Sequence, residues 1–258
     1  MDGSTSEPRR ISAGGCSETG PVRSQNQDWL HWDAALGLFV VADGMGGHKA
    51  GEVASHLAVD AVCDFVAASR DADDLTWPFG VDPARSLEGN RLATAVRLAN
   101  RRVYQEGQAH PEFTGMGTTL VAVLLGRHGT AVAGVGDSRV YLWRRGVLQQ
   151  LTHDDTWLET VLGAEAARGA PAHPMRHVLT SVVGSREDTP PEIVEPALER
   201  GDMLLLSTDG LHSVLDDRHI AEVLTGETEP GRAAERLVAD AIERQSTDNV
   251  TALVLRLD

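Results

Sequence analysis

Cysteines and long apolar runs are scarce in this sequence of 258 residues, and each shortage excludes a class of protein. The two cysteines, Cys16 and Cys63, are too few for a disulfide framework and predict a reducing compartment. The longest purely apolar runs, such as residues 38–42 and 120–125, are far too short to cross a bilayer. No secretory signal is recognisable either. We therefore expect a cytoplasmic protein that has no membrane partner.

Positive charge is the next shortage. The chain has 23 Lys and Arg residues against 38 Asp and Glu residues, which gives a formal net charge of −15. Proteins that bind nucleic acid need clustered cations to neutralise phosphates, so this balance excludes a nucleic-acid partner and disfavours a nuclease. Excess acidity usually serves solubility, but carboxylates that converge on bound cations would lose part of their repulsion. The positions of the aspartates decide between these two interpretations.

Short apolar stretches and glycine turns dominate the chain after a polar start. Residues 1–10 predict a disordered leader, and residues 11–258 predict a single domain. Stretches rich in Val and Leu predict strands at residues 36–42, 119–125, 130–135, 139–143, 203–207 and 250–257. Tight turns that contain glycine, at residues 126–129, 136–138 and 145–146, predict antiparallel pairing of the strands beside them.

Helices are indicated by a period of 3.6 residues. Apolar side chains recur on one face in residues 54–65, 90–108 and 234–242. Because each helix is apolar on one side only, we expect each to cover a sheet rather than lie inside one. The sequence therefore predicts an α+β layered sandwich, with irregular segments at residues 70–89 and 151–177.

Aspartates stand at the ends of these apolar stretches. Asp43 and Asp209 each close such a stretch and precede a glycine. Asp137 follows a third stretch, and Asp248 stands just before the last one. A single Asp-Gly after a strand is more often a turn than a ligand, but four aspartates in such positions favour a site for a hard cation such as Mg²⁺ or Mn²⁺. No His and Cys pattern with zinc spacing competes with this interpretation.

Arg23 lies five residues before Asp28 in a segment that we expect to be extended. Its planar guanidinium matches two oxygens of a phosphate, so an arginine beside a metal site is suited to hold a phosphate group. On its own, Arg23 would be a surface arginine.

Six motifs occur in order along the chain: RSQNQD at 23–28, VADGMGGH at 41–48, GMGTTL at 115–120, VGDSR at 135–139, LSTDGL at 206–211 and DNVT at 248–251. Each is weak alone, but the ordered set resembles the type 2C, or PPM, family of metal-dependent serine/threonine protein phosphatases in its bacterial form. The resemblance covers essentially residues 11–258. It implies a four-layer αββα sandwich, in which helices flank two antiparallel sheets.

The resemblance also implies a centre of two Mn²⁺ or Mg²⁺ ions, with a third cation as in bacterial relatives. Asp43 would bridge the two cations, and the backbone carbonyl of Gly44 would bind one of them. Asp209 and Asp248 would hold the other. Asp137 would hold the third cation.

The implied reaction is direct hydrolysis of phosphoserine and phosphothreonine in proteins, without a phosphoenzyme. Arg23 would clamp the substrate phosphate, and Asp28 would hydrogen-bond water bound at the centre. The implied enzyme is a monomer that opposes a cognate bacterial serine/threonine kinase. Two departures from the family pattern are Gln27, where many relatives carry Glu, and Met45, where eukaryotic relatives carry a His proposed as general acid.

Two other functions remain open at this stage. A non-catalytic module that binds phosphoproteins on the same fold would require the loss of metal ligands, and none is lost. A phosphatase specialised for antagonists of anti-sigma factors would use the same chemistry, and the intact motif from Arg23 to Asp28 argues mildly against it.

Overall fold

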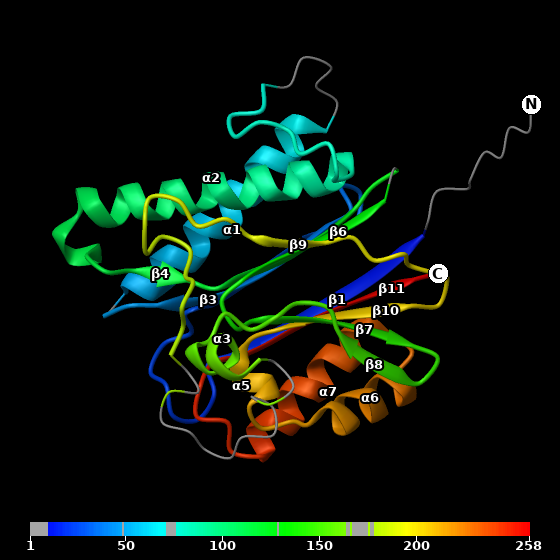
Figure 1. Ribbon diagram of the computed structural model, residues 1–258. Helices are drawn as coiled ribbons and strands as arrows, with labels where there is room; N and C mark the ends of the chain where they lie inside the picture. The colour runs from blue at the N-terminus through cyan, green and yellow to red at the C-terminus, as the bar shows by residue number, and fades with distance from the viewer. Residues whose placement is uncertain are drawn as a thin grey trace, which may run out of the picture.

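The computed structural model describes residues 10–47, 49–70, 76–127, 129–163, 166, 175 and 178–258. Almost all of the predicted leader, residues 1–9, lies outside these residues. Two antiparallel sheets face each other, and helices cover both outer faces (Figure 1). This arrangement confirms the predicted four-layer αββα sandwich.

The strands and helices are bounded as follows. The strands are β1 Ile11–Glu18, β2 Asp28–Asp33, β3 Leu38–Met45, β4 Gly117–Thr118, β5 Leu120–Leu125, β6 Thr130–Val135, β7 Arg139–Arg144, β8 Val147–Gln150, β9 Glu192–Val194, β10 Met203–Ser207 and β11 Val250–Leu257. The helices are α1 Ala50–Ser69, α2 Leu87–Ala109, α3 Trp157–Leu162, α5 Asp209–His212, α6 Asp217–Gly226 and α7 Pro230–Glu243, with a 3₁₀ turn at Pro111–Phe113. No helix among the described residues is long and apolar enough to span a membrane.

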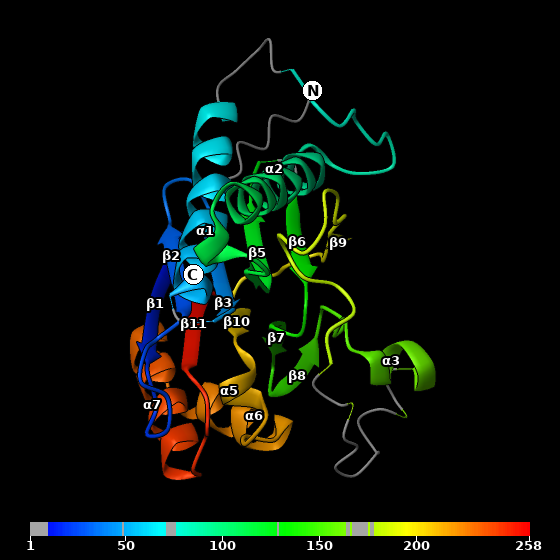
Figure 2. The same cartoon turned by 90° about the vertical axis from the view of Figure 1, so that its left-hand side faces the viewer.

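Every strand predicted from the sequence is present, and the edge strands were missed. One sheet has the order β1-β11-β10-β7-β8, and the other has the order β2-β3-β5-β6-β9 with β4 paired to β3. Figure 2 shows the two sheets from the side, with β1 and β2 at the same edge. Of the missed strands, β1 and β2 are half-buried and polar or rich in glycine, as in the sequence ISAGGCSE of β1, so they lack the apolar runs that reveal the central strands. The missed strands β4, β8 and β9 are only two to four residues long.

The turn at residues 136–138 corrects one prediction. The turns at 126–129 and 145–146 do join antiparallel neighbours, β5 with β6 and β7 with β8. The connection at 136–138, however, passes from β6 in one sheet to β7 in the other. β6 is wholly buried and β7 is buried in its middle, so their sequences do not show which sheet each belongs to. As a result, Asp137 lies on a crossing between the two sheets.

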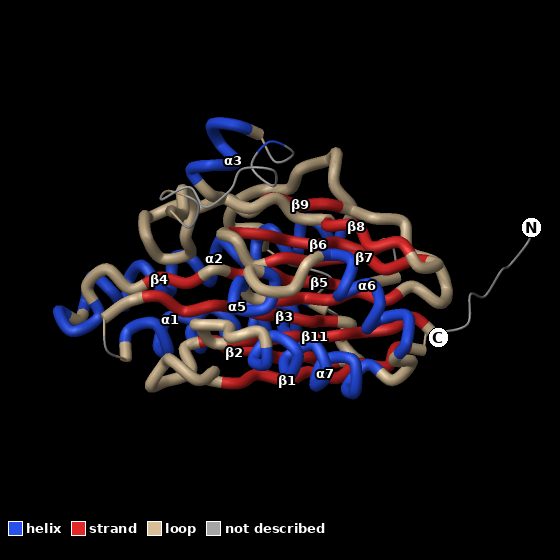
Figure 3. The backbone as a smooth tube through the Cα atoms, turned by 90° about the horizontal axis from the view of Figure 1, so that it is seen from below, coloured by secondary structure: helices blue, strands red, loops and turns tan. Residues whose placement is uncertain are grey.

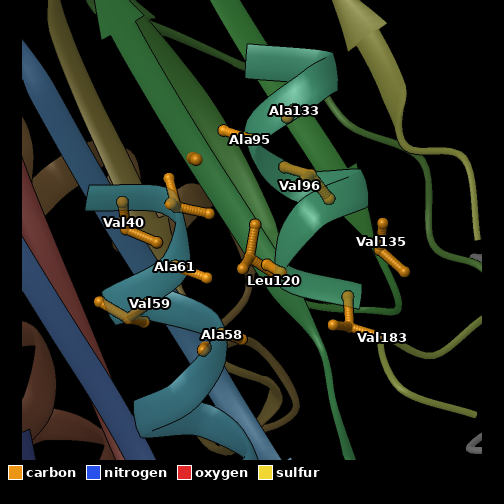
Figure 4. Packing of buried hydrophobic residues seen from close by; sticks show 14 of the residues in the cluster. Val40, Ala58, Val59, Ala61, Ala95, Val96, Leu120, Ala133, Val135 and Val183 are labelled. Atoms are coloured by element: carbon orange, nitrogen blue, oxygen red, sulfur yellow. The ribbon is translucent and has the colours of Figure 1, made fainter. Parts of the chain in front are cut away.

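The core has three layers of apolar side chains. Phe39, Leu204 and Leu253 are among those fully buried between the two sheets. Helices α1 and α2 cover the six-stranded sheet, where small side chains such as Ala58 and Ala95 let the helices approach the strands closely (Figure 4). Helices α6 and α7 cover the five-stranded sheet. The faces predicted for α1, α2 and α7 are the buried ones, and these layers hold the ends of the strands in place.

Candidate metal and phosphate site

The predicted site residues come together at one end of the sandwich. Asp28 and Asp43 are paired neighbours at the same end of β2 and β3. Asp209 is the first residue of α5 and lies two residues after the end of β10, and Asp248 lies two residues before the start of β11. The first residues of β11 pair with the end of β10. The elements are seen from below in Figure 3, and α5 packs against β11 and α7. The antiparallel register of each sheet therefore brings acidic residues that are far apart in sequence to one end.

Asp28 connects the two sheets. Its Oδ2 atom accepts hydrogen bonds from the Thr208 hydroxyl at 2.9 Å and the Thr251 hydroxyl at 2.6 Å. Its Oδ1 atom is buried without a hydrogen-bond partner. Burial, opposed by these two hydroxyls and reinforced by the charges of Asp209 and Asp248, raises the pKa of Asp28 to about 7. A buried carboxylate oxygen with no partner is a position that a water or a cation would satisfy.

Asp43 is held by its backbone rather than by its carboxylate. Its N–H donates to the Thr119 hydroxyl at 3.0 Å, and its carbonyl accepts from the Thr119 N–H at 2.8 Å and from the Thr118 hydroxyl at 2.8 Å. Strand β3 does not end at Asp43, as the sequence predicted, because Gly44 and Met45 continue it by pairing with β4. The carboxylate is thus carried on rigid backbone.

The carboxylates at this end repel one another. Burial raises the pKa of Asp43 well above its usual range, and the charges of Asp28, Asp209, Asp137 and Asp248 raise it further, in that order. Four acidic groups that act on a fifth must lie close together. A cation among them would remove this repulsion.

Gly44 lies where the backbone of β3 passes close to the start of α1. A Cβ atom at this position would lie 2.0 Å from the carbonyl oxygen of Gly51 and 2.7 Å from that of Gln27. The Gly44 N–H donates to the Gln27 carbonyl at 3.1 Å. Only glycine fits this close approach. The position predicted to bind a cation through its carbonyl therefore cannot carry a side chain.

Arg23 lies at the same end, bound to a predicted metal ligand. Its Nη2 atom is 2.6 Å from Asp248 Oδ2, and the two side chains are 52% and 31% exposed. The hydrogen bond that Arg23 donates to Asp248 is the main cause that raises the pKa of Arg23. The exposed guanidinium is therefore positively charged and lies at the edge of the carboxylate cluster, where it can reach a phosphate from solvent.

Asn249 is a structural residue of the site to which the sequence analysis gave no role. Its side-chain amide donates to the carbonyls of Thr19 and Gln25 at 2.9 Å each. Its Oδ1 accepts from the Gln27 N–H at 2.8 Å. It therefore holds the segment that carries Arg23 against the start of β11. The asparagine is part of the motif DNVT, but its position beside an aspartate in the sequence does not show which distant loop its side chain binds.

Asp137 lies on the crossing between the sheets, and its charge is one of those that act on Asp43. Its side chain is nearly buried, at 8% exposure. Burial, followed by the charges of Asp209 and Asp154, raises the pKa of Asp137 to about 7. The charge of Asp209 raises the pKa of both Asp43 and Asp137, so Asp209 lies near both.

The residues present fit hard divalent cations. As the described side chains stand, no group of three or more His, Cys, Asp or Glu residues could hold a metal ion. The groups that lie at this end are carboxylates and backbone carbonyls, the oxygen ligands that Mg²⁺ and Mn²⁺ prefer. Their mutual repulsion and the unpartnered Oδ1 of Asp28 are what a bound cation would compensate.

The stability of the metal-free protein is expected to fall as pH rises from about 4 to about 7, the interval between the ordinary aspartate pKa and the raised values of Asp28 and Asp137. In this interval the folded state retains protons that the unfolded state has lost, so each step upward in pH favours unfolding. Thermal unfolding in EDTA at pH 5 and pH 7.5 measures the effect. Saturating Mn²⁺ should remove most of it, because cations stabilise the ionised carboxylates. A melting temperature in EDTA that is constant or rises over this interval would contradict the prediction.

Comparison with known proteins finds that the relatives of this chain are phosphatases. The family whose profile matches residues 22–245 is described as protein phosphatase 2C. The chain is 36% identical over 240 residues to the serine/threonine protein phosphatase PstP of Mycobacterium tuberculosis, and this match covers 92% of the chain but 43% of the relative. The chain thus spans less than half the length of PstP. It is 30% identical over 247 residues to the protein phosphatase PhpP of Streptococcus pneumoniae, with 94% of this chain and 96% of the relative covered.

Solved structures agree with these sequence relatives. The crystal structure of M. tuberculosis PstP superposes with a TM-score of 0.81 at 33% identity, covering 96% of this chain and 99% of that one. A second structure, of the PstP catalytic domain in complex with two manganese ions, superposes with a TM-score of 0.79 at 32% identity and the same coverage. Nearly the whole length of this chain therefore shares the fold of the PstP structures.

Proposed function

Because this chain belongs to the protein phosphatase 2C family, we propose that it hydrolyses phosphoserine and phosphothreonine in proteins at a centre of two Mn²⁺ or Mg²⁺ ions. The observation that carries the proposal is the ion pair between Arg23 and Asp248. It places a cation suited to phosphate directly on a cluster of carboxylates suited to metals. Neither feature alone would indicate phosphoester chemistry.

Different residues would bind the different cations. Asp43 would bridge the pair, the carbonyl of Gly44 would bind one cation, and Asp209 and Asp248 would bind the other. Asp137 would hold a third. When bound, the cations supply an activated water and neutralise the charge of the phosphoryl oxygens. Without them, the carboxylates at this end repel one another.

Arg23 and Asp28 act beside the cations. In the proposed complex, the guanidinium of Arg23 exchanges part of its contact with Asp248 for two oxygens of the substrate phosphate, which its planar fork matches. Asp28 is fixed by Thr208 and Thr251 through one oxygen, so its other oxygen is left to orient water. Met45 pairs with Gly117 on the β3–β4 edge and offers no acid, so a proton for the leaving group must come from elsewhere.

Phosphoproteins are the proposed substrates, and a cognate serine/threonine kinase is the proposed opponent of the reaction. The relatives PstP and PhpP are named as protein phosphatases. The alternative, a non-catalytic module on the same fold, gains no support, because every residue predicted to bind a cation is present at the same end of the sandwich.

Removal of divalent cations tests the proposed function. The purified chain is expected to hydrolyse p-nitrophenyl phosphate and a phosphothreonine peptide when Mn²⁺ is present. Excess EDTA should abolish both activities, and added Mn²⁺ should restore them, because the described site contains no other electrophile besides Arg23. Inhibitors directed at thiols should have no effect. No activity with any divalent cation, or full activity in excess EDTA, would overturn the proposal.

A further inference from the structure

We infer that Arg139 and Asp154 form a clamp that positions Asp137 for the third, weakly held cation and couples that position to residues 152–163. This inference rests on the proposed function, because it concerns a cation that the proposed centre would hold. Neither member of the clamp is a predicted ligand. Each would act on the cation only through the placement of Asp137.

The ion pair itself is rigid and largely buried. Arg139 is the first residue of β7 and follows Asp137 by two positions. Its Nε lies 2.8 Å from Asp154 Oδ1, its Nη2 lies 2.7 Å from Asp154 Oδ2, and the two side chains are 14% and 9% exposed. Its Nη1 donates to the hydroxyl of the fully buried Tyr141 at 2.8 Å. Because the guanidinium donates to Asp154 on one side and to Tyr141 on the other, the Arg139 side chain is held in one orientation.

The residue on the other side of Asp137 is bound to the neighbour of Asp154. The Gly136 N–H donates to Asp155 Oδ2 at 3.0 Å, and the Asp155 N–H donates to the Gly136 carbonyl at 2.9 Å. Asp137 is therefore bracketed. The residue before it and the second residue after it are both fastened to the same pair, Asp154 and Asp155.

The ion pair between Arg139 and Asp154 leaves the negative charge of Asp137 available to a bound cation. The guanidinium of Arg139 is committed to Asp154 and Tyr141, and the structure shows no hydrogen bond from it to Asp137. An arginine that instead paired directly with Asp137 would replace a cation there. Asp137 thus retains a carboxylate that a divalent cation can bind.

Contacts extend from the clamp in two directions. On one side, the Ser138 hydroxyl lies 2.7 Å from that of Thr119, which accepts the N–H of Asp43. On the other side, the Asp154 N–H donates to Glu159 of α3 at 3.0 Å, and the Asp155 carbonyl accepts from Thr180 at 2.7 Å. A shift of α3 would therefore reach Asp137 through the clamp.

Arg139→Lys is the test, because it keeps the charge and removes the fork. Mn²⁺ binding to the full chain is measured by electron paramagnetic resonance, which detects free Mn²⁺. The affinity of the weakest site should fall about tenfold, the loss usual when a residue that orients a metal ligand is changed. The affinities of the tighter sites should stay within about twofold of the wild type. The Mn²⁺ concentration for half-maximal activity should rise in parallel, with kcat at saturating Mn²⁺ nearly unchanged. Hydrogen exchange of residues 154–159 should be faster.

Arg144→Lys is the matched control. Arg144 ends the same strand and makes an equivalent fork with Asp202, at 2.8 and 2.6 Å, at the other end of the sandwich. This variant should match the wild type in every Mn²⁺ measurement. If the weakest site is unchanged in Arg139→Lys, or equally weakened in both variants, the inference is wrong.

Remaining outcomes separate the inference from the proposed function. A wild-type protein that is active with only two Mn²⁺ sites overturns the inference and leaves the function standing. A wild-type protein that neither binds Mn²⁺ nor hydrolyses phosphoesters overturns the function itself. If Arg139→Lys does not fold, Asp154→Asn replaces it in the same measurements, and a failure of both to fold would show a purely structural pair and overturn the inference.

Discussion

An Asp43→Asn variant is expected to lose more than about 100-fold in kcat/KM for Mn²⁺-dependent phosphoester hydrolysis, since changes in residues that merely orient ligands already cost 10- to 100-fold. Asparagine keeps the size of the side chain and the backbone bonds to Thr118 and Thr119, so the strand should be undisturbed. What it removes is the charge on which Asp28, Asp209 and Asp137 act. The loss should therefore come from cation binding, and a Mn²⁺ isotherm should show it directly.

The same variant is expected to be more stable than the wild type in EDTA at pH 7.5. Burial and four neighbouring charges raise the pKa of Asp43, so the ionised group is unfavourable in the metal-free fold, and a neutral amide relieves this. Asp64→Asn, which removes an exposed charge on α1, is the control and should alter neither activity nor stability appreciably. Activity of Asp43→Asn within tenfold of the wild type would exclude a bridging role for this residue.

The sequence predicted the acidic cluster better than it predicted what holds it together. Asp43 and Asp209 can be recognised as candidate ligands because a charged side chain next to a buried strand is costly unless another group compensates its charge. The glycine that follows each aspartate marks a turn. An apolar stretch predicts that a strand is buried, but it does not predict which other strand ends beside it. Asp28 and Asp43 are partners because β2 pairs with β3 in a particular register, and β2 has too few apolar residues to be predicted.

Contacts between distant loops were beyond prediction for a related reason. Asn249 fastens residues 19–27 to the start of β11, and its three hydrogen bonds depend on where both loops arrive in the fold. The clamp between Arg139 and Asp154 depends likewise on β6 and β7 belonging to different sheets. The predicted hairpin at residues 136–138 would have placed Asp137 at a turn within one sheet, away from the crossing where its neighbours hold it.

A Gly210→Ala variant is expected to weaken Mn²⁺ binding more than tenfold and to destabilise the fold by about 1–3 kcal/mol, the usual cost of an extra methyl group in a filled space. A Cβ atom on Gly210 would lie 2.0 Å from the carbonyl oxygen of Asn249 and 3.4 Å from the Cβ of Asp248. Because the obstacle is backbone, α5 and the loop before β11 must separate. Asp209 is the first residue of α5, so the separation moves it away from Asp248.

The control for Gly210→Ala is Gly226→Ala, at the end of α6, where a Cβ atom would meet nothing within 4 Å. It should bind Mn²⁺ as the wild type does and be equally or slightly more stable, because alanine restricts the unfolded chain. Isothermal titration with Mn²⁺ and thermal unfolding in EDTA distinguish the two variants. If Gly210→Ala lost stability but kept wild-type Mn²⁺ affinity, Asp209 and Asp248 would not need to be neighbours. The assignment of both to one cation would then be wrong, even if the protein remained a phosphatase.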